Sequence, residues 1–154
     1  MPHFSYGDVI WGGCGVVNAK RLQVTQNYAV KSILGMRKRD SATEAFKQLK
    51  FLNLTQRRQV HEVVFTSKAL NNMLPDNINK VYGNQQPTSC TRASHSGKLN
   101  LPKHKTAKYQ QSLLYRTINT WNALPSTLNH TTTQQLKTQY QRMLINNTHN
   151  IRTA

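Results

Sequence analysis

The sequence predicts a mainly α-helical protein: a small domain of about five helices with one long, polar and basic loop. Three observations lead to this class. Apolar residues recur at helical spacing in several segments, capping residues precede those segments, and Gly or Pro follows them. With 154 residues, the chain is long enough for one modest hydrophobic core. We therefore expect a single helical domain over residues 1–146 and a frayed tail over 147–154.

The N-terminal part contains an apolar lead segment and the first long helix. Residues 1–12 are aromatic and apolar, and the glycines that follow predict a turn. A helix is predicted over 18–34, because Asn18 can cap its start and Gly35 its end. The side of this helix that we expect to face inward consists of Ala19, Leu22, Ala29, Val30 and Ile33, with Gln26 as a polar exception.

A helical pair is predicted over 41–82. Ser41 and Glu44 form a capping-box pattern at its start, in which each side chain satisfies a backbone N–H. The longer second helix opens at Thr55 and stops at Pro75. One mostly apolar stripe runs along this helix and consists of Val60, Val63, Val64, Ser67, Leu70, Asn71 and Leu74.

A polar, basic loop follows over 83–107. It is too long for an ordinary connection, so we expect it to be functional or mobile. Leu99 and Leu101 alternate with polar residues, which is compatible with one short strand near 98–101. Two helices are then predicted over 109–145. The first buries Trp121 and ends at Leu124-Pro125, and the second starts within Thr131 to Thr133.

Charge is the most unusual property of the chain. Lys and Arg number 21 and Asp and Glu only five, for a formal net charge of +16. Self-repulsion of this size destabilises a compact chain unless a polyanion offsets it, so nucleic acid is the expected partner, bound through its backbone without sequence preference. Simple solubility and an anionic membrane surface are the alternatives, and the even spread of the charges disfavours the membrane.

The candidate phosphate contacts lie in three groups. The first is a basic linker after the first helix, the second a pair near the start of the long helix, and the third a cluster in the polar loop. For the second group, the alternative is that one side chain packs its stem on the preceding helix. The eight residues are Arg37, Lys38 and Arg39, then Arg57 and Arg58, then Lys103, Lys105 and Lys108.

The carboxylates give little support to enzymatic chemistry. Nucleotidyl transfer and phosphate hydrolysis require carboxylates that converge on a metal or substrate. Glu44 and Asp76 are already explained as helix caps, and Asp40 lies next to a cap. This leaves Asp8 and Glu62, on different elements. Zinc ligands at Cys-x-x-Cys spacing are missing as well. We therefore predict neither an enzyme nor a cofactor or metal.

The location predicted from the sequence is intracellular, in the nucleus or the cytoplasm. The N-terminus has no signal-peptide pattern, and no apolar run is long enough to span a bilayer. Two cysteines, Cys14 and Cys90, do not make a disulfide framework.

Several short motifs occur in order along the chain. They are Pro2-x-x-x-Tyr6-Gly7-x-Val9-Ile10-Trp11-Gly12, Leu22-Gln23-x-x-Gln26-Asn27-x-Ala29-Val30, Leu49-x-x-Leu52-x-Leu54-x-x-Arg57-Arg58, Lys68-Ala69-Leu70-Asn71, Arg92 in the polar loop, and Trp121-Asn122-Ala123-Leu124-Pro125. In this order and spacing they resemble the region that follows the polymerase core in non-LTR retrotransposon reverse transcriptases of the jockey-like type. Gly7 stands where that family more usually has Cys.

The resemblance implies a thumb-like, C-terminal segment of a reverse transcriptase, separated from the polymerase core of the parent protein. The family's catalytic Asp-Asp motif would lie upstream, so no catalytic residue is carried over. In the parent, such a segment would hold the backbone of the template and primer. Two other interpretations stay open: a non-functional relic of a retroelement, and a helical interaction module that recruits an acidic protein.

Overall fold

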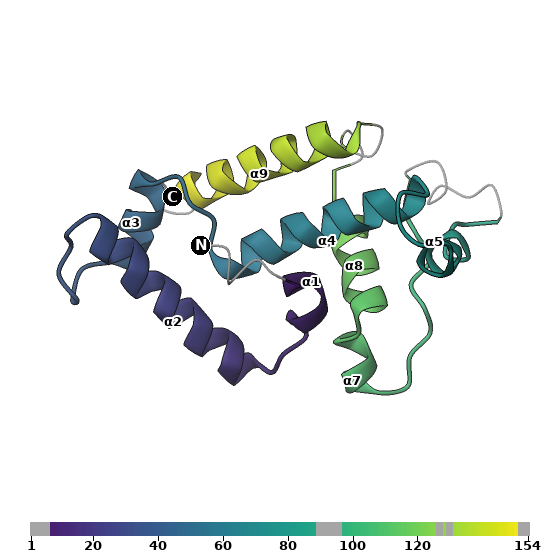
Figure 1. The fold of residues 1–154 in the computed structure, drawn as a ribbon, viewed down its shortest axis with the longest axis horizontal. Helices are drawn as coiled ribbons and strands as arrows, with labels where there is room; N and C mark the ends of the chain where they lie inside the picture. The colour runs from purple at the N-terminus through teal and green to yellow at the C-terminus, as the bar shows by residue number, and fades with distance from the viewer. Residues whose placement is uncertain (1–6, 89–96, 126–127, 129–130, 151–154) are drawn as a thin grey trace. The chain divides into compact units, whose positions relative to one another are not determined.

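The computed structural model describes residues 7–88, 97–125, 128 and 131–150, and these residues are mainly helical, which confirms the predicted class (Figure 1). The predictions for Tyr6, Arg92 and the last four residues lie outside this part of the chain. The helices are α1 (Asp8–Trp11), α2 (Val16–Ile33), α3 (Ala42–Gln48), α4 (Leu54–Leu70), α5 (Asp76–Gly83), α7 (Ala107–Gln110), α8 (Leu113–Asn122) and α9 (Thr133–Asn150).

The expected number of about five helices is too low for the described residues. Two of the additional helices, α1 and α7, have four residues each. A single turn is too short to show a 3.6-residue repeat, so neither of these helices has a periodic pattern that could predict it.

The chain divides into two compact units. Unit 1 comprises Met1–Arg58 and Tyr140–Ala154, and unit 2 comprises Gln59–Gln139. Both boundaries fall inside a helix, so α4 and α9 contribute residues to each unit. A single domain over 1–146 stays a prediction, and the two units are described separately below.

In unit 1, α2 and α3 pack side by side (Figure 1). Val30, Ala45 and Phe46 are buried between them, and Leu34, Met36, Ala42 and Leu49 pack against this core. α2 begins directly after Gly15, which is earlier than the predicted cap at Asn18. Ile33 was predicted to face inward but is 59% exposed, because α2 ends at this residue and the chain then reverses.

The helix ends share one backbone arrangement. After α2, Gly35 has φ +63°, its N–H donates to the Ser32 carbonyl, and the Met36 N–H donates to the Lys31 carbonyl. This is the Schellman motif, and it confirms Gly35 as the residue that ends the helix. The same pair of hydrogen bonds ends α3 and α4, but there the left-handed positions hold Lys50, with φ +51°, and Asn72, with φ +56°.

An amide clamp, formed by Gln23, Gln26 and Asn27 of α2, holds the connection between α3 and α4. Gln26 is 3% exposed and donates its Nε2 to the Leu52 carbonyl at 3.1 Å. Gln23 Oε1 accepts the N–H of Leu54 at 3.0 Å, while Gln23 Nε2 donates to Asn27 Oδ1 at 2.8 Å. The polar exception on the inner side of α2 therefore binds backbone groups that would otherwise be buried without partners.

The helix starts in unit 1 differ in part from their predictions. Ser41 is the N-cap of α3 as predicted, but its side chain makes no capping hydrogen bond. α4 begins at Leu54, one residue before the predicted Thr55, because Asn53 and Gln56 form a reciprocal capping box. The Gln56 N–H donates to Asn53 Oδ1 at 2.8 Å, and the Asn53 N–H donates to Gln56 Oε1 at 3.2 Å.

In unit 2, α4 packs against α5, α8 and the start of α9. The Phe65 and Tyr82 rings meet edge to face with centroids 6.0 Å apart, and the Ser67 and Thr133 hydroxyls are 2.9 Å apart. The predicted stripe is confirmed at the buried Val60, Val63 and Ser67 and is wrong at the exposed Asn71. α4 ends at Leu70, before the predicted stop at Pro75, because the left-handed Asn72 reverses the chain.

The predicted helices over 109–145 also have different bounds. Ser112 interrupts the first of them, because its hydroxyl accepts the N–H of Tyr115 and caps α8 separately from α7. α9 starts within the predicted Thr131 to Thr133 and continues to Asn150, so the tail expected from residue 147 is helical at its first four residues. The apolar repeat of this helix stops at Ile145, so no pattern in the sequence predicted that α9 continues to Asn150.

Candidate nucleic-acid interface

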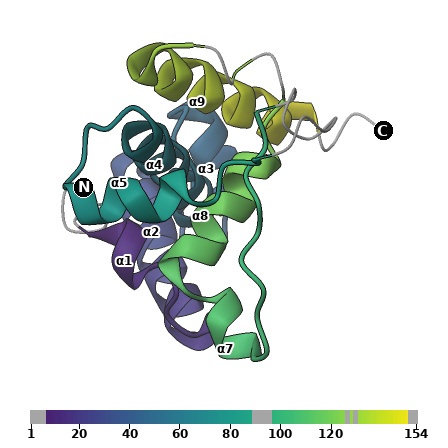
Figure 2. The same cartoon turned by 90° about the vertical axis from the view of Figure 1, so that its right-hand side faces the viewer.

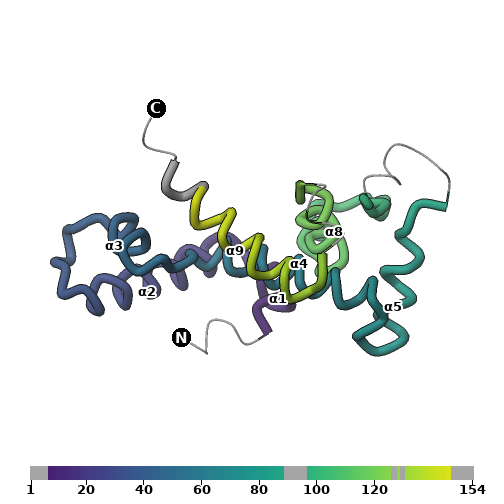
Figure 3. The backbone as a smooth tube through the Cα atoms, turned by 90° about the horizontal axis from the view of Figure 1, so that it is seen from above, coloured from purple at the N-terminus to yellow at the C-terminus, as the bar shows by residue number. Residues whose placement is uncertain are grey.

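The first three predicted contacts, Arg37, Lys38 and Arg39, lie in the connection between α2 and α3 and are exposed (Figure 3). Two hydrogen bonds fix this turn: the Arg37 N–H donates to Asp40 Oδ2 at 2.6 Å, and Lys31 Nζ donates to the Lys38 carbonyl at 3.0 Å. Both bonds use backbone groups of the basic residues. The turn is therefore held in place while the three side chains stay exposed, with Lys38 Nζ 5.8 Å from the centroid of the Tyr28 ring.

Arg57 and Arg58 lie near the start of α4 and are half-buried. The Arg58 guanidinium lies 4.6 Å from the centroid of the Trp11 ring, a distance at which the indole π face attracts a cation. Its Nε and Nη2 atoms are buried and have no hydrogen-bond partner among the described residues. Arg58 therefore packs on α1. From the sequence, we had considered that the aliphatic part of Arg57 or Arg58 packs on the preceding helix, α3.

The last three contacts, Lys103, Lys105 and Lys108, are exposed in unit 2. Lys103 and Lys105 belong to an extended segment, residues 97–106, which we call the basic strap and which leads into α7 beside α8 (Figures 1 and 2). His104 lies between these two lysines, 2.7 Å from the Gln110 side chain and edge to face with Tyr115 at 4.9 Å. Lys103 and Lys105 flank His104 in the chain, and both are exposed.

The C-terminal end of α8 anchors the start of the basic strap. Trp121 Nε1 donates to the Gly97 carbonyl at 3.0 Å. Asn122 brackets Leu99: its Oδ1 accepts the Leu99 N–H at 2.9 Å, and its Nδ2 donates to the Leu99 carbonyl at 2.8 Å. The short strand expected near 98–101 is therefore wrong, because a side-chain amide takes the place that a partner strand would occupy. The burial predicted for Trp121 is confirmed.

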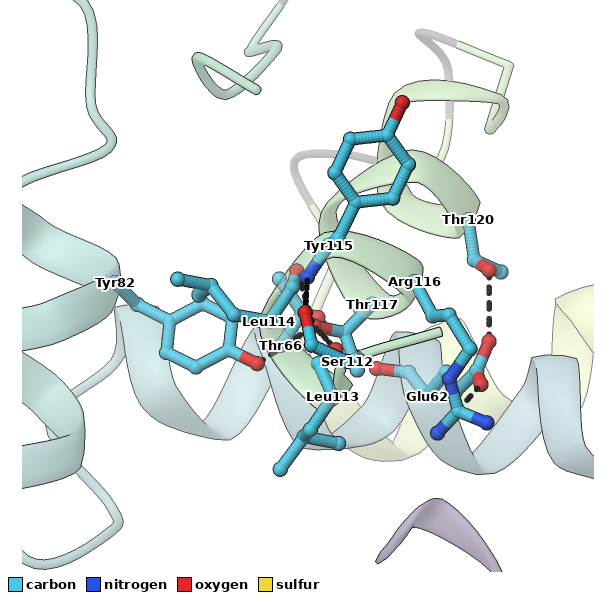
Figure 4. Close-up of polar contacts among 10 residues, drawn as sticks. All are labelled: Glu62, Thr66, Tyr82, Ser112, Leu113, Leu114, Tyr115, Arg116, Thr117 and Thr120. Carbon is cyan, nitrogen blue, oxygen red and sulfur yellow. Dashed lines mark hydrogen bonds and ion pairs between the residues drawn. The ribbon is translucent and has the colours of Figure 1, made fainter. Parts of the chain in front are cut away.

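A buried polar cluster joins α4 to α8 (Figure 4). Glu62 is 6% exposed, its Oε1 lies 3.6 Å from Arg116 Nη2, and its Oε2 accepts the Thr120 hydroxyl at 2.7 Å. This ion pair was not predicted from the sequence. The one indication in the sequence was an isolated Glu62 beside the apolar stripe of α4. Its partner Arg116 lies 54 residues later, and no local pattern connects the two residues.

Tyr82 of α5 extends the same cluster. Its hydroxyl lies 2.6 Å from Thr117 Oγ1, and Thr117 donates its one proton to the Leu113 carbonyl at 2.9 Å (Figure 4). The Leu114 carbonyl lies 3.1 Å from the same Thr117 hydroxyl. Burial raises the pKa of the Tyr82 hydroxyl above its ordinary value of 10.0. The cluster holds α5, α8 and α4 together, and α8 in turn carries Trp121 and Asn122, which anchor the strap.

The carboxylates of the described chain are dispersed. Asp8 and Glu62 are both buried but belong to different units, and Asp40 bonds to the turn after α2. Glu44 and Asp76 lie in the first turns of α3 and α5, where they interact favourably with the helix dipole. In the described residues, no group of three or more His, Cys, Asp or Glu side chains could hold a metal ion.

Both units carry the excess of positive charge. Unit 1 has twelve Lys and Arg against three Asp and Glu, and unit 2 has nine against two. Each unit by itself can therefore attract a polyanion. The exposed cations of the two predicted loop sites are the groups best placed to meet phosphates directly.

Comparisons with known proteins add no assignment. No protein-family model, curated protein or solved structure matches this chain. The resemblance to non-LTR reverse transcriptases therefore rests on the motifs of the sequence. Within the described residues, no helix is both long and apolar enough to cross a membrane.

Proposed function

We propose that this chain is a C-terminal, post-polymerase segment of a non-LTR retroelement reverse transcriptase and that it binds nucleic-acid backbone without reading sequence. The observation that carries the proposal is a chain of net charge +16 whose basic strap is anchored with its lysines exposed. The anchoring matters because a cation held on a rigid support loses little conformational entropy when it meets a phosphate.

The motif residues have structural uses that agree with the proposal. In unit 1, Gln23 and Gln26 clamp the backbone before α4. In unit 2, Trp121 and Asn122 fix the strap. Residues that position loops are expected to recur as a motif, and both motifs here position segments next to predicted phosphate contacts.

The spacing of the strap lysines suits a phosphate backbone. Lys103 and Lys105 are two residues apart, so their Cα atoms are about 6.6 Å apart in an extended chain. A B-form strand rises about 3.4 Å per phosphate along its axis and also winds around that axis, so neighbouring phosphates are farther apart than this rise. Two lysines at this spacing can therefore meet neighbouring phosphates of one strand without any contact to a base.

The test is a binding titration across salt concentrations. We would measure fluorescence anisotropy of a labelled RNA–DNA hybrid with the wild-type chain and with a triple variant, Lys103→Gln, Lys105→Gln and Lys108→Gln. Each lost contact should flatten the log–log salt dependence by about 0.7 to 0.9. A triple variant at the exposed Lys20, Lys68 and Lys80 removes the same charge elsewhere and is the matched control. Equal slopes for the two triple variants would refute the strap as the contact surface.

One observation favours a second function, the recruitment of an acidic protein. On α2, Val17, Val24 and Tyr28 are 66%, 47% and 48% exposed, and Lys20 and Arg21 lie between them. Apolar residues flanked by cations suit the face of an acidic amphipathic helix. Binding of an acidic helical peptide that nucleic acid cannot displace, and that Val24→Asp abolishes, would support this function over the first.

A further inference from the structure

A groove of about 280 Å³ lies within unit 1, between α2, α3 and the start of α4. Its walls combine two aromatic rings, Phe46 and Phe51, with amide and hydroxyl side chains. A flat heterocycle with polar edges needs this combination: an apolar face to stack on and hydrogen-bonding groups around it.

The groove has rigid walls. The amide clamp ties α2 to the α3–α4 connection through the Leu52 carbonyl and the Leu54 N–H. The Asn53–Gln56 capping box fixes the first turn of α4 on the same side. A ligand would therefore find these groups already in place and would lose little affinity to ordering them.

Several polar groups of the lining remain available to a ligand. Asn27 uses its Oδ1 within the clamp, and Asn53 uses its Oδ1 in the capping box, but neither Nδ2 donates to another described residue. The hydroxyls of Thr43 and Thr55 likewise make no hydrogen bond within the described part of the chain. Donors and acceptors are thus both present at the rim, and this is what the edge of a nucleobase requires.

Phe51 provides the stacking surface. It follows Lys50 in the Schellman turn that ends α3, and its N–H donates to the Phe46 carbonyl. An apolar residue is common at this position of the turn. Phe51 is 48% exposed at the groove, where an unpaired base could cover it.

We propose that this groove binds one unpaired nucleobase of a single-stranded nucleic acid, with the base stacked on Phe51 and its edge toward Asn27 and Asn53. Lys50, exposed and next to Phe51, would meet the phosphate of that nucleotide. This inference rests on the proposed function, because it takes nucleic acid as the ligand. It adds a contact with bases, whereas the proposed function involves the backbone alone. It predicts a preference for single strands that expose their bases.

The test compares two labelled single strands of equal length and charge, one with bases and one abasic. Wild type should bind the strand with bases between about fivefold and 150-fold more tightly, the range for stacking one base on an aromatic ring. Phe51→Leu keeps an apolar side chain in the turn but should abolish most of this preference. Phe51→Trp should retain it, with tryptophan fluorescence quenched by the strand with bases.

Two controls separate this inference from the proposed function. Ile33→Ala removes an apolar side chain that is 59% exposed on α2 and is absent from the groove lining, so it should leave the preference unchanged. Equal binding of both strands by wild type, with steep salt dependence, would overturn the base site and leave backbone binding intact. Failure to bind either strand would overturn both.

Discussion

Replacing Glu62 by Gln should destabilise the protein much more than the same change at an exposed carboxylate. The Glu62 side chain is 8% exposed and its partner Arg116 is 17% exposed, so the pair is largely removed from water. Glu62→Gln retains an oxygen for the Thr120 hydroxyl but leaves the guanidinium without its counter-charge. Breaking a buried pair on one side costs about 3 to 5 kcal/mol, and the partial exposure of Arg116 places this case near about 3 kcal/mol.

The assay is urea unfolding followed by circular dichroism, with thermal melts as a second measurement. A loss of about 3 kcal/mol corresponds to a fall in Tm of roughly 6 to 12 °C for a chain of this size. Glu44→Gln, which changes an exposed carboxylate in the first turn of α3, is the control and should cost only about 0.5 kcal/mol.

A double-mutant cycle makes the argument specific to the ion pair. Arg116→Met alone leaves the Glu62 carboxylate without its cation, but the double variant Glu62→Gln, Arg116→Met leaves no uncompensated charge. The double variant should therefore lose less stability than the sum of the single variants, by about 1 to 3 kcal/mol. Additive effects, or a Glu62→Gln cost as small as that of Glu44→Gln, would refute the assignment of this pair as a buried, coupled contact.

Three further predictions concern single residues. Lys50→Gly should stabilise unit 1 by about 0.5 to 1 kcal/mol in urea unfolding, because glycine adopts φ +51° without steric cost; a loss of stability would contradict this. Asn122→Leu leaves the Leu99 N–H and carbonyl without side-chain partners, at about 1 to 3 kcal/mol each, so trypsin should cleave the strap faster; an unchanged rate would contradict the anchoring. Above about pH 10 the unfolded chain releases the Tyr82 proton while the folded chain retains it, so stability should fall with rising pH; Tyr82→Phe should remove this part of the fall, and identical alkaline profiles would contradict it.

The sequence was sufficient for features that depend on neighbouring residues. The end of α2 at Gly35 depends on backbone hydrogen bonds between residues at most five positions apart, so a local pattern could predict it. The apolar repeat of α4 likewise predicted the burial of Val60 and Val63. Helix class and most helix starts follow from such local patterns. The left-handed positions after α3 and α4 hold Lys50 and Asn72 instead of glycine, the residue that usually marks such a turn. The end of α4 was therefore predicted too late in the sequence.

Features that depend on distant partners could not be predicted. Gln26 was identified as a polar residue on an apolar face, but its partner is the carbonyl of Leu52, whose position only the fold defines. The alternation around Leu99 suggested a strand because an extended chain usually bonds to another strand, whereas Asn122 supplies both bonds here. For the candidate site, the lysines predicted in the strap and at the start of α7 are exposed, and their role as phosphate contacts stays a prediction. No local pattern could show that Arg58 packs on Trp11.

Binding of a labelled RNA–DNA hybrid across a salt series tests the central claim most directly. The account predicts binding by the folded chain with a steep log–log salt dependence, which flattens when Lys103, Lys105 and Lys108 are replaced and not when the control lysines are. A folded chain that does not bind the hybrid even at low salt would contradict it.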